Sequence, residues 1–172
     1  MLNQEEVLKL FEKSGALLHG HFKLTSGLHS ETYLEKSKVL QYPKYTEILC
    51  KEIAERFKND NIEVVVGPVT GGIILAYEVA KNLNTRGIFT EREEGKMALR
   101  RGFEIKPNER VLIVEDIITT GGSVVEVINV VKELKGNIIG VGLLVDRSGG
   151  KIDFGVRKEA LATLNVENFE PE

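Results

Sequence analysis

The spacing of apolar residues predicts two helices in the first third of the chain. Asn3 to Glu6 has the form of a capping box, and the apolar residues after it recur at roughly helical spacing, which predicts a helix over residues 3–13. After Pro43, apolar residues recur at every fourth position, at Tyr45, Leu49, Ile53 and Phe57. This ladder predicts a second helix that begins at the proline.

The following part of the chain alternates between apolar strands and helices. Strands are predicted over residues 62–67, 87–90, 111–114 and 138–145, and helices over residues 72–83 and 123–135. This alternation predicts an α/β fold with a central, mostly parallel sheet flanked by helices. Because ligands bind at the carboxyl ends of such strands, three segments are candidate site loops: residues 67–72, 115–123 and 146–150.

Two stretches contain several glycines, and the residues around those glycines predict a different structure for each stretch. Residues 20–40 mix glycine and serine with aromatic and aliphatic residues, which predicts a β-rich excursion that caps the site. Residues 136–142 place glycines inside an apolar strand, where close packing is the simpler explanation. No linker, repeat or low-complexity tract divides the chain, so we expect a single domain over residues 1–172.

Composition and charge narrow the functional classes. The chain has 172 residues, 42% of them hydrophobic and 28% charged, as is typical of a soluble globular protein. Its net charge of −3 argues against a nucleic-acid backbone as the main partner, and no apolar stretch is long enough to span a membrane. A lone cysteine, Cys50, excludes an internal disulfide, and three histidines without cysteine partners make a poor zinc set. The acidic, amphipathic N-terminus does not resemble a signal peptide, so a cytoplasmic location is expected.

The stretch VLIVEDIITTGGS, residues 111–123, combines two adjacent acids with a turn of small residues. Glu115 and Asp116 follow the apolar run, so we expect both to be solvated and to face a cleft. Backbone N–H groups and hydroxyls from Thr119 to Ser123, at the start of a helix, form a suitable phosphate site. The acids would then accept hydrogen bonds from vicinal ribose hydroxyls of the same ligand. The alternative is a solvated strand end followed by an ordinary helix cap.

Two further segments have the chemistry to bind a second anionic group. GPVTGG, residues 67–72, lies between a buried strand and a helix, where its backbone can wrap an anion or form a simple turn. Residues 89–103 carry four bases, Arg92, Lys96, Arg100 and Arg101. A mobile basic loop would stabilise an anionic leaving group and exclude water. Because three glutamates in the same segment nearly balance these bases, a charged surface hairpin is the competing interpretation.

VLIVEDIITTGGS resembles the phosphoribosyl diphosphate (PRPP) signature of type I phosphoribosyltransferases. The resemblance implies the fold of that family, with a small N-terminal hood over residues 1–40 and a flexible catalytic loop over about 91–102. It implies that Glu115 and Asp116 hold the ribose, that Thr70 and Gly71 belong to the diphosphate loop, and that Mg²⁺ acts mainly through substrate and water. The implied PRPP loop comprises Glu115, Asp116, Ile117, Ile118, Thr119, Thr120, Gly121, Gly122 and Ser123.

Other segments are similar to one branch of that family, the orotate phosphoribosyltransferases. They are the TSG of residues 25–27 with HSETY after it, the ERE, GK and LRRGF of residues 91–103, and VDRSGG of residues 145–150. The likeness implies transfer of ribose 5-phosphate from PRPP to orotate, giving orotidine 5′-monophosphate and diphosphate in de novo pyrimidine biosynthesis. It also implies a homodimer in which Arg92 and Lys96 reach the neighbouring subunit's site. Asp116, Glu115, Lys96 and Arg92 would be catalytic, and Thr119, Arg147 and Tyr33 would bind orotate.

The sequence departs from this branch at several basic positions. A lysine, a histidine and a Tyr-Lys pair of the family correspond here to Glu93, Ala98 and Thr70-Gly71, and a lysine near the orotate pocket corresponds to Thr25. Arg100 or Arg101 could replace the missing loop bases, and Lys23 could replace the pocket lysine. Three alternatives stay open: a purine phosphoribosyltransferase, a non-catalytic PRPP-binding regulator, and a plain α/β interaction domain.

Overall fold

The computed structural model describes residues 1–23 and 29–165. The TSG motif of residues 25–27 therefore lies outside the described residues. The helices are α1 (Gln4–Lys13), α2 (Lys36–Leu40), α3 (Pro43–Phe57), α4 (Gly71–Leu83) and α5 (Gly122–Glu133). The strands are β1 (Leu17–Lys23), β2 (His29–Leu34), β3 (Val64–Pro68), β4 (Arg86–Glu93), β5 (Lys96–Leu99), β6 (Arg110–Ile118), β7 (Asn137–Asp146) and β8 (Lys158–Thr163).

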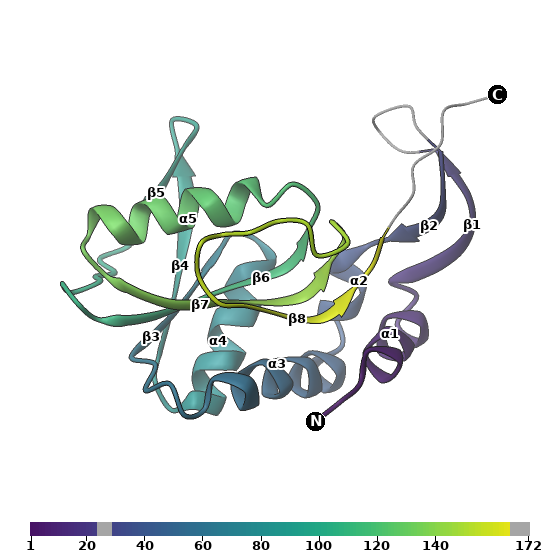
Figure 1. Ribbon diagram of the computed structural model, residues 1–172, viewed down its shortest axis with the longest axis horizontal. Coiled ribbons are helices and arrows are strands. Elements are labelled where there is room, and N and C mark those ends of the chain that lie inside the picture. Colours follow the sequence, from purple (N-terminus) through teal and green to yellow (C-terminus); the bar gives the residue numbers. More distant parts are fainter. Residues whose placement is uncertain (24–28, 166–172) are drawn as a thin grey trace.

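The central sheet has six strands in the order β5-β4-β3-β6-β7-β8. All neighbours are parallel except β4 and β5, which form an antiparallel hairpin. Helix α5 covers one face, and α3 and α4 cover the other (Figure 1). This is the predicted α/β fold with a mostly parallel sheet flanked by helices, so the expected fold class is confirmed.

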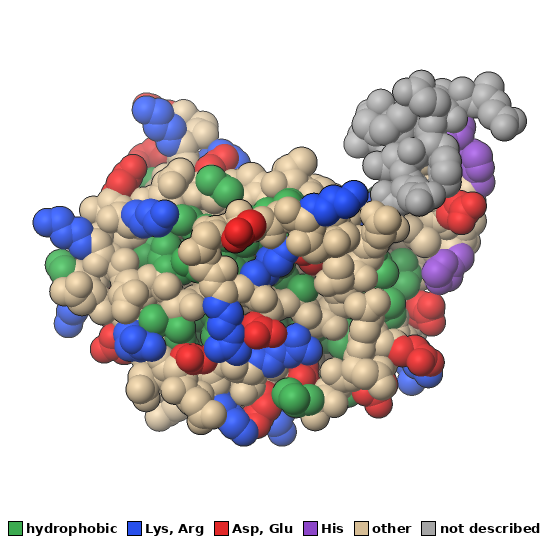
Figure 2. Space-filling model, viewed as in Figure 1, with side chains coloured by type: hydrophobic (Ala, Val, Ile, Leu, Met, Phe, Trp, Pro, Cys, Tyr) green, Lys and Arg blue, Asp and Glu red, His purple; other side chains and the backbone are tan. Residues whose placement is uncertain are grey.

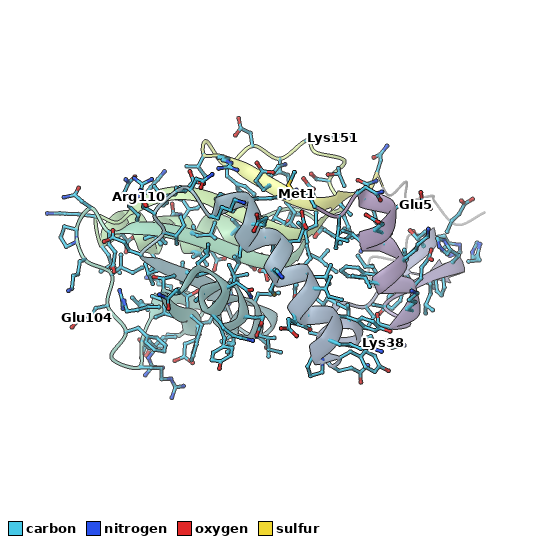
Figure 3. All side chains as sticks on the ribbon, turned by 90° about the horizontal axis from the view of Figure 1, so that it is seen from below. Met1, Glu5, Lys38, Glu104, Arg110 and Lys151 are labelled. Carbon is cyan, nitrogen blue, oxygen red and sulfur yellow. The ribbon has the colours of Figure 1, made fainter. Side chains whose placement is uncertain are left out.

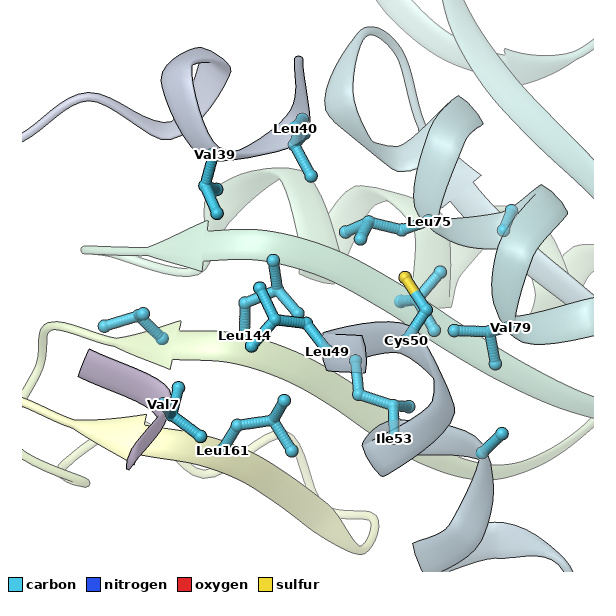
Figure 4. Packing of buried hydrophobic residues seen from close by; sticks show 14 of the residues in the cluster. Val7, Val39, Leu40, Leu49, Cys50, Ile53, Leu75, Val79, Leu144 and Leu161 are labelled. Atoms are coloured by element: carbon cyan, nitrogen blue, oxygen red, sulfur yellow. The ribbon is translucent and has the colours of Figure 1, made fainter. Parts of the chain in front are cut away.

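The two faces of the sheet have separate cores. On one side, Val64, Ile113 and Leu143 of the sheet pack with α5 residues such as Val127 and Val131. On the other, the predicted ladder of α3 buries Leu49, Ile53 and Phe57 completely. Figure 4 shows Leu49, Cys50 and Ile53 of this helix meeting residues of α1, α2, α4, β7 and β8.

The glycines of β7 let α3 approach the sheet closely. A Cβ on Gly140 would lie 2.7 Å from Phe57 Cε1, and one on Gly142 would lie 2.7 Å from Ile53 Cγ2. Both distances are shorter than a van der Waals contact, so these positions accept only glycine without movement of α3. The interpretation of residues 136–142 as a closely packed strand is confirmed.

The N-terminal segment forms a small unit beside the main sheet. The capping box at Asn3 and Glu6 starts α1, as predicted, and β1 and β2 then pair in a separate antiparallel sheet. Figure 1 shows α1, β1 and β2 at one end of the molecule, with α2 leading back to the central sheet. The prediction of a β-rich stretch through residue 40 was wrong at its end, because residues 36–40 form α2.

Candidate active site

Three loops meet at the carboxyl edge of the sheet, because β3, β6 and β7 are neighbours in it. They are the loops that the sequence indicates, after residues 67, 115 and 146. The backbone N–H of Arg147 donates to the carbonyl of Ile118 at 2.9 Å, which ties the last loop to the middle one. Gly71 in the first loop lies so close to Asp116 that a Cβ there would collide with its Oδ2 atom. The glycine is thus needed for the first and middle loops to touch.

The loop between β6 and α5 has the form of an anion site. A cavity of about 200 Å³ is bounded by Lys36, Glu115 and the continuous run from Ile117 to Val124. Gly121 adopts a φ of 76°, and a Cβ there would lie 2.9 Å from the Phe154 ring. Helix α5 then starts at Gly122, with Thr119, Thr120 and Ser123 exposed around it. The first N–H groups of α5 lack partners within the helix, and its dipole favours an anion at this end.

The two acids are buried, which corrects the expectation that they are solvated. Glu115 is 7% exposed and Asp116 is 1% exposed. The reason is that β6 continues to Ile118, four residues beyond the apolar run, so both acids lie within the strand. Burial, followed by the adjacent charge of Asp116, raises the pKa of Glu115 to about 8. The negative charge of these two buried carboxyl groups therefore needs to be compensated by a ligand, a cation or a proton.

The two acids border different cavities, because neighbouring residues of a strand point to opposite faces. Glu115 borders the anion-site cavity, whereas Asp116 borders a second cavity of about 500 Å³. Val69, Thr70 and Gly71 form one wall of that second cavity. Another wall is formed by Lys36, Ser37 and Leu40 of α2 with Gln41, the residue that follows the helix. Asp116 Oδ1 accepts a hydrogen bond from the Ile117 N–H at 2.6 Å, while its buried Oδ2 has no partner within the described residues. This oxygen remains able to accept a hydrogen bond from a ligand.

Lys36 lies between the two cavities and borders both. Its Nζ atom is 3.3 Å from Asp116 Oδ1, and its side chain is 51% exposed. The sequence interpretation missed this residue, because the five residues of α2 are too few to show a helical period. The only local signal is Glu35, whose side chain caps α2 by accepting a hydrogen bond from the Ser37 N–H.

The loop that carries Arg147 is held by a buried acid. Asp146 is fully buried and accepts hydrogen bonds from Lys158 Nζ at 2.8 Å and from Ser148 Oγ at 2.6 Å. Burial alone would raise the pKa of Asp146, but these hydrogen bonds outweigh it and leave the pKa lowered. The Arg147 side chain itself is half-buried beside this anchored turn. The sequence predicts the position of Arg147 at a strand end but not Lys158, since β8 is not evident from the sequence.

The basic segment of residues 91–102 forms the hairpin β4–β5, the alternative that the sequence left open. Glu91 pairs with Arg101, with Nε and Oε1 2.7 Å apart, and Glu93 pairs with Arg100 at 3.1 Å. Arg92 pairs with Glu126 of α5 at 2.7 Å. Figure 2 shows acidic and basic side chains next to one another on this projecting hairpin.

Arg92, Lys96 and Tyr33 are not brought into the two cavities within this chain. The two basic residues lie on the paired strands β4 and β5, where Glu93 is opposite Lys96. Tyr33, on β2, is 38% exposed, and its hydroxyl donates to Glu35 at 3.3 Å. The predicted PRPP loop, Thr70 and Gly71 thus come together around Asp116, whereas these three residues lie elsewhere.

No three His, Cys, Asp or Glu side chains of the described ranges converge in a way that could hold a metal ion. Among the same residues, no helix has the length and apolarity needed to cross a membrane.

Comparison with known proteins identifies the family. The phosphoribosyl transferase domain matches residues 39–154. The orotate phosphoribosyltransferases of Desulforamulus reducens and Thermoanaerobacter sp. strain X514 are 57% and 58% identical to this chain over 171 residues. Each alignment covers 99% of this chain and 90% of the relative.

Solved structures agree in fold but differ in the base that their names specify. Orotate phosphoribosyltransferase from Aeropyrum pernix superposes with a TM-score of 0.71 at 28% identity, covering 91% of this chain and 93% of that one. Adenine phosphoribosyltransferase from Rhodothermus marinus superposes with a TM-score of 0.67 at 22% identity, covering 91% and 99%. Since the fold is shared by enzymes for different bases, the assignment to a branch rests on sequence identity. The chain belongs to the orotate phosphoribosyltransferase family.

Proposed function

We propose that this chain transfers the ribose 5-phosphate group of PRPP to orotate, giving orotidine 5′-monophosphate and diphosphate in de novo pyrimidine biosynthesis. The observation that carries the proposal is the meeting of three loops at the end of β6, beside Asp116 and Ile118, in a chain that is 57% identical to a named orotate phosphoribosyltransferase. In this reaction the bond between the anomeric carbon and the diphosphate oxygen breaks, and a bond to a ring nitrogen of orotate forms.

The cavity at the start of α5 is proposed to hold the 5′-phosphate of PRPP. Residues from Thr119 to Ser123 surround that cavity, and the unpaired N–H groups of the helix face an anion. The adjacent acids, Glu115 and Asp116, are proposed to accept hydrogen bonds from the ribose hydroxyls. Asp116 Oδ2 supports this role, because it is buried without a hydrogen-bond partner among the described residues.

The acids also have an electrostatic role in this mechanism. As the diphosphate leaves, positive charge develops on the sugar, and a carboxylate held nearby in a buried site stabilises it. Because its pKa is raised to about 8, Glu115 carries a proton at neutral pH before substrate binds. Glu115 can then donate a hydrogen bond to the ligand, while the unpartnered Asp116 Oδ2 can accept one. No general base is needed, since orotate can ionise at the attacking nitrogen.

The second cavity is proposed to hold the diphosphate, with Thr70 and Gly71 forming its wall. Mg²⁺ bound there would neutralise charge on the leaving group. The residues present suit this ion, because Mg²⁺ is commonly held by one or two carboxylates together with substrate phosphates and water. Asp116 provides one carboxyl group at this cavity, and the described ranges contain no cluster of three or more metal-binding side chains.

Orotate is proposed to bind beside the loop after β7, through Arg147, Thr119 and Tyr33. A guanidinium offers a planar set of donors to an anion with ring carbonyls. Arg147 is joined to the phosphate loop through its backbone bond to Ile118, so the base and the sugar would lie side by side. Tyr33 requires the hood to approach this loop. A cytoplasmic location is also proposed, and fractionation of cells that express the chain would test it.

One assay separates the candidate functions. The purified protein is given PRPP and Mg²⁺ with orotate, uracil, adenine, hypoxanthine or guanine in separate reactions, and base consumption is followed by absorbance. We expect orotate alone to be consumed, and EDTA to stop the reaction until Mg²⁺ is restored. Consumption of a purine with orotate unchanged would identify a purine phosphoribosyltransferase instead. PRPP binding without consumption of any base would indicate a regulator.

A further inference from the structure

The residue that connects the two cavities is a cation contributed by the N-terminal unit. Lys36 is the first residue of α2, and it borders both the cavity at the start of α5 and the cavity beside Thr70 and Gly71. The structure places its ammonium group 3.3 Å from Asp116 Oδ1. Half of its side chain is exposed, so the ammonium is free to move from Asp116 to a ligand.

A cation is needed where the two cavities meet, to balance the negative charge of the site and of its proposed ligand. Within the described residues, Lys36 is the one lysine or arginine that borders either cavity. The loop of residues 67–72 contributes backbone and a threonine hydroxyl but no positive charge. Arg100 and Arg101 form ion pairs within the hairpin, and Arg92 pairs with Glu126 of α5. Without Lys36, a diphosphate in the second cavity would therefore meet the buried Asp116 carboxyl group with no basic side chain of the same subunit's described residues beside it.

We propose that Lys36 binds the diphosphate of PRPP, supplying the positive charge that the loop of residues 67–72 lacks. This inference rests on the proposed reaction and adds a residue to it. In the free protein, Asp116 holds the ammonium in place. When PRPP binds, the ammonium forms a charge-assisted hydrogen bond with a diphosphate oxygen, and Asp116 turns to the ribose. The same contact stabilises the leaving group as its negative charge increases.

A purely structural role for Lys36 makes a different prediction. If the lysine only neutralised Asp116, its loss would weaken all ligands of the site alike and would lower the stability of the free protein. Loss of a diphosphate contact would instead weaken diphosphate selectively, because ribose 5-phosphate has no diphosphate group to reach Lys36. The two roles are thus separated by comparing these two ligands.

The experiment compares Lys36→Met, Lys36→Arg and a control, Lys38→Met. Lys38 is an exposed lysine on the same helix that borders neither cavity, and Figure 3 shows it at the surface. Affinities for inorganic diphosphate and for ribose 5-phosphate, each with Mg²⁺, are measured by titration calorimetry, and KM is measured for PRPP and orotate. Circular dichroism and the melting temperature verify that each variant folds.

We expect Lys36→Met to weaken diphosphate binding and to raise the KM for PRPP by about tenfold or more, the value of one charge-assisted hydrogen bond. Binding of ribose 5-phosphate and the KM for orotate should change much less. Lys36→Arg should retain most of the diphosphate affinity, and Lys38→Met should match the wild type. If Lys36→Met fails to fold, Lys36→Gln, which keeps a polar group beside Asp116, serves for the same comparison.

Two results would overturn the inference. They are unchanged diphosphate affinity in a folded Lys36 variant, and an equal loss of affinity for diphosphate and ribose 5-phosphate. The proposed function is tested separately by the wild type: a wild-type protein that binds diphosphate but does not consume orotate would refute the reaction, whereas the binding comparison would still decide whether Lys36 contacts diphosphate.

Discussion

Two neighbouring carboxyl groups, those of Glu115 and Asp116, lie almost out of contact with water at the end of β6. Each accepts a hydrogen bond from a backbone N–H close to it in sequence, and Lys36 is the nearest cation. Burying two acids in this way costs folding free energy, and the proposed hydrogen bonds to the ribose would offset that cost when the substrate binds. The buried acids thus lower the stability of the folded protein until a substrate binds.

This burial makes stability depend on pH in a defined window. The folded-state pKa of Glu115 is raised from 4.5 to about 8, so the folded protein holds a proton that the unfolded chain has lost. Between these pH values the contribution of Glu115 to the free energy of unfolding falls as pH rises. We expect Glu115→Gln, which cannot ionise, to become more stable relative to the wild type by up to about 1.4 kcal/mol per pH unit. Urea unfolding at pH 5, 6, 7 and 8 measures this difference.

The control for this measurement is Glu133→Gln, because Glu133 is an exposed glutamate in the last turn of α5. Its stability should follow the wild type at all four pH values. A difference between Glu115→Gln and the wild type that stays constant over this range would mean that Glu115 keeps an ordinary pKa in the folded protein.

At the scale of elements, α5 is positioned by glycines that also leave room for a ligand. A Cβ added at Gly122 would have only Thr120 Oγ1 near it, at 3.8 Å, so the free protein has space for a methyl group. Alanine is also a better helix residue than glycine by about 1 kcal/mol. In the proposed complex, however, the phosphate must contact this part of the backbone, and a methyl group would hold it away.

Gly122→Ala should therefore separate folding from binding. We expect its melting temperature to equal or exceed that of the wild type, while the KM for PRPP rises by about tenfold or more through loss of phosphate contacts. Differential scanning calorimetry and steady-state kinetics measure the two effects. An unchanged KM would exclude the start of α5 as the phosphate site.

A substitution where α3 packs on β7 should have the opposite effect, lowering stability without changing substrate binding. Gly142→Ala would place a methyl group 2.7 Å from Ile53 Cγ2, on the face of β7 that packs against α3. Such overpacking costs about 1–3 kcal/mol, so the unfolding midpoint in urea should fall while the KM for PRPP is unchanged. Adding Ile53→Ala provides space for the methyl group, and the double variant should lose less stability than the two single variants summed. Strict additivity would show that the two positions do not touch.

The elements that the sequence predicts are those with long apolar patterns. The helices over residues 4–13 and 43–57 and the strands β3, β6 and β7 follow from periodicity, and their carboxyl ends indicate the loops of the site. Helix α2 and strand β5 are short, and β8 has only two buried residues, so none of them has a clear period. Lys36 and Lys158 lie on these elements, which is why their contacts with Asp116 and Asp146 were not predictable.

At the scale of the whole molecule, the β4–β5 hairpin is the part whose proposed role requires a second chain. Arg92 and Lys96 border neither cavity, and Arg92 is paired with Glu126 of its own chain. We propose that the chain forms a homodimer in which the hairpin reaches the neighbouring site. The ion pair with Glu126 would break as Arg92 turns to the diphosphate there.

Mixing two inactive variants tests this proposal. Lys96→Ala and Asp116→Asn should each lower kcat by orders of magnitude, the first through the hairpin and the second through the ribose site. If the hairpin acts on the neighbouring subunit, every mixed dimer contains one site with both native residues. After subunits are exchanged at equal concentrations, activity should recover to about a quarter of the wild-type rate. No recovery in confirmed mixed dimers would place the hairpin in its own subunit's reaction.

The order of the strands also has a consequence for synthesis of the protein. Strand β3 pairs with β4 and β6, and β6 pairs with β3 and β7. The strands that complete the sheet around β3 therefore all come later in the chain than β3 itself. A ribosome that has released only residues up to α4 has made the loop of residues 67–72 and helix α2, but not β6 with Asp116. The buried acids enter the fold only when β6 inserts between β3 and β7. A nascent chain would thus remain unable to bind PRPP until β7 emerges, which makes ligand binding a late event of translation.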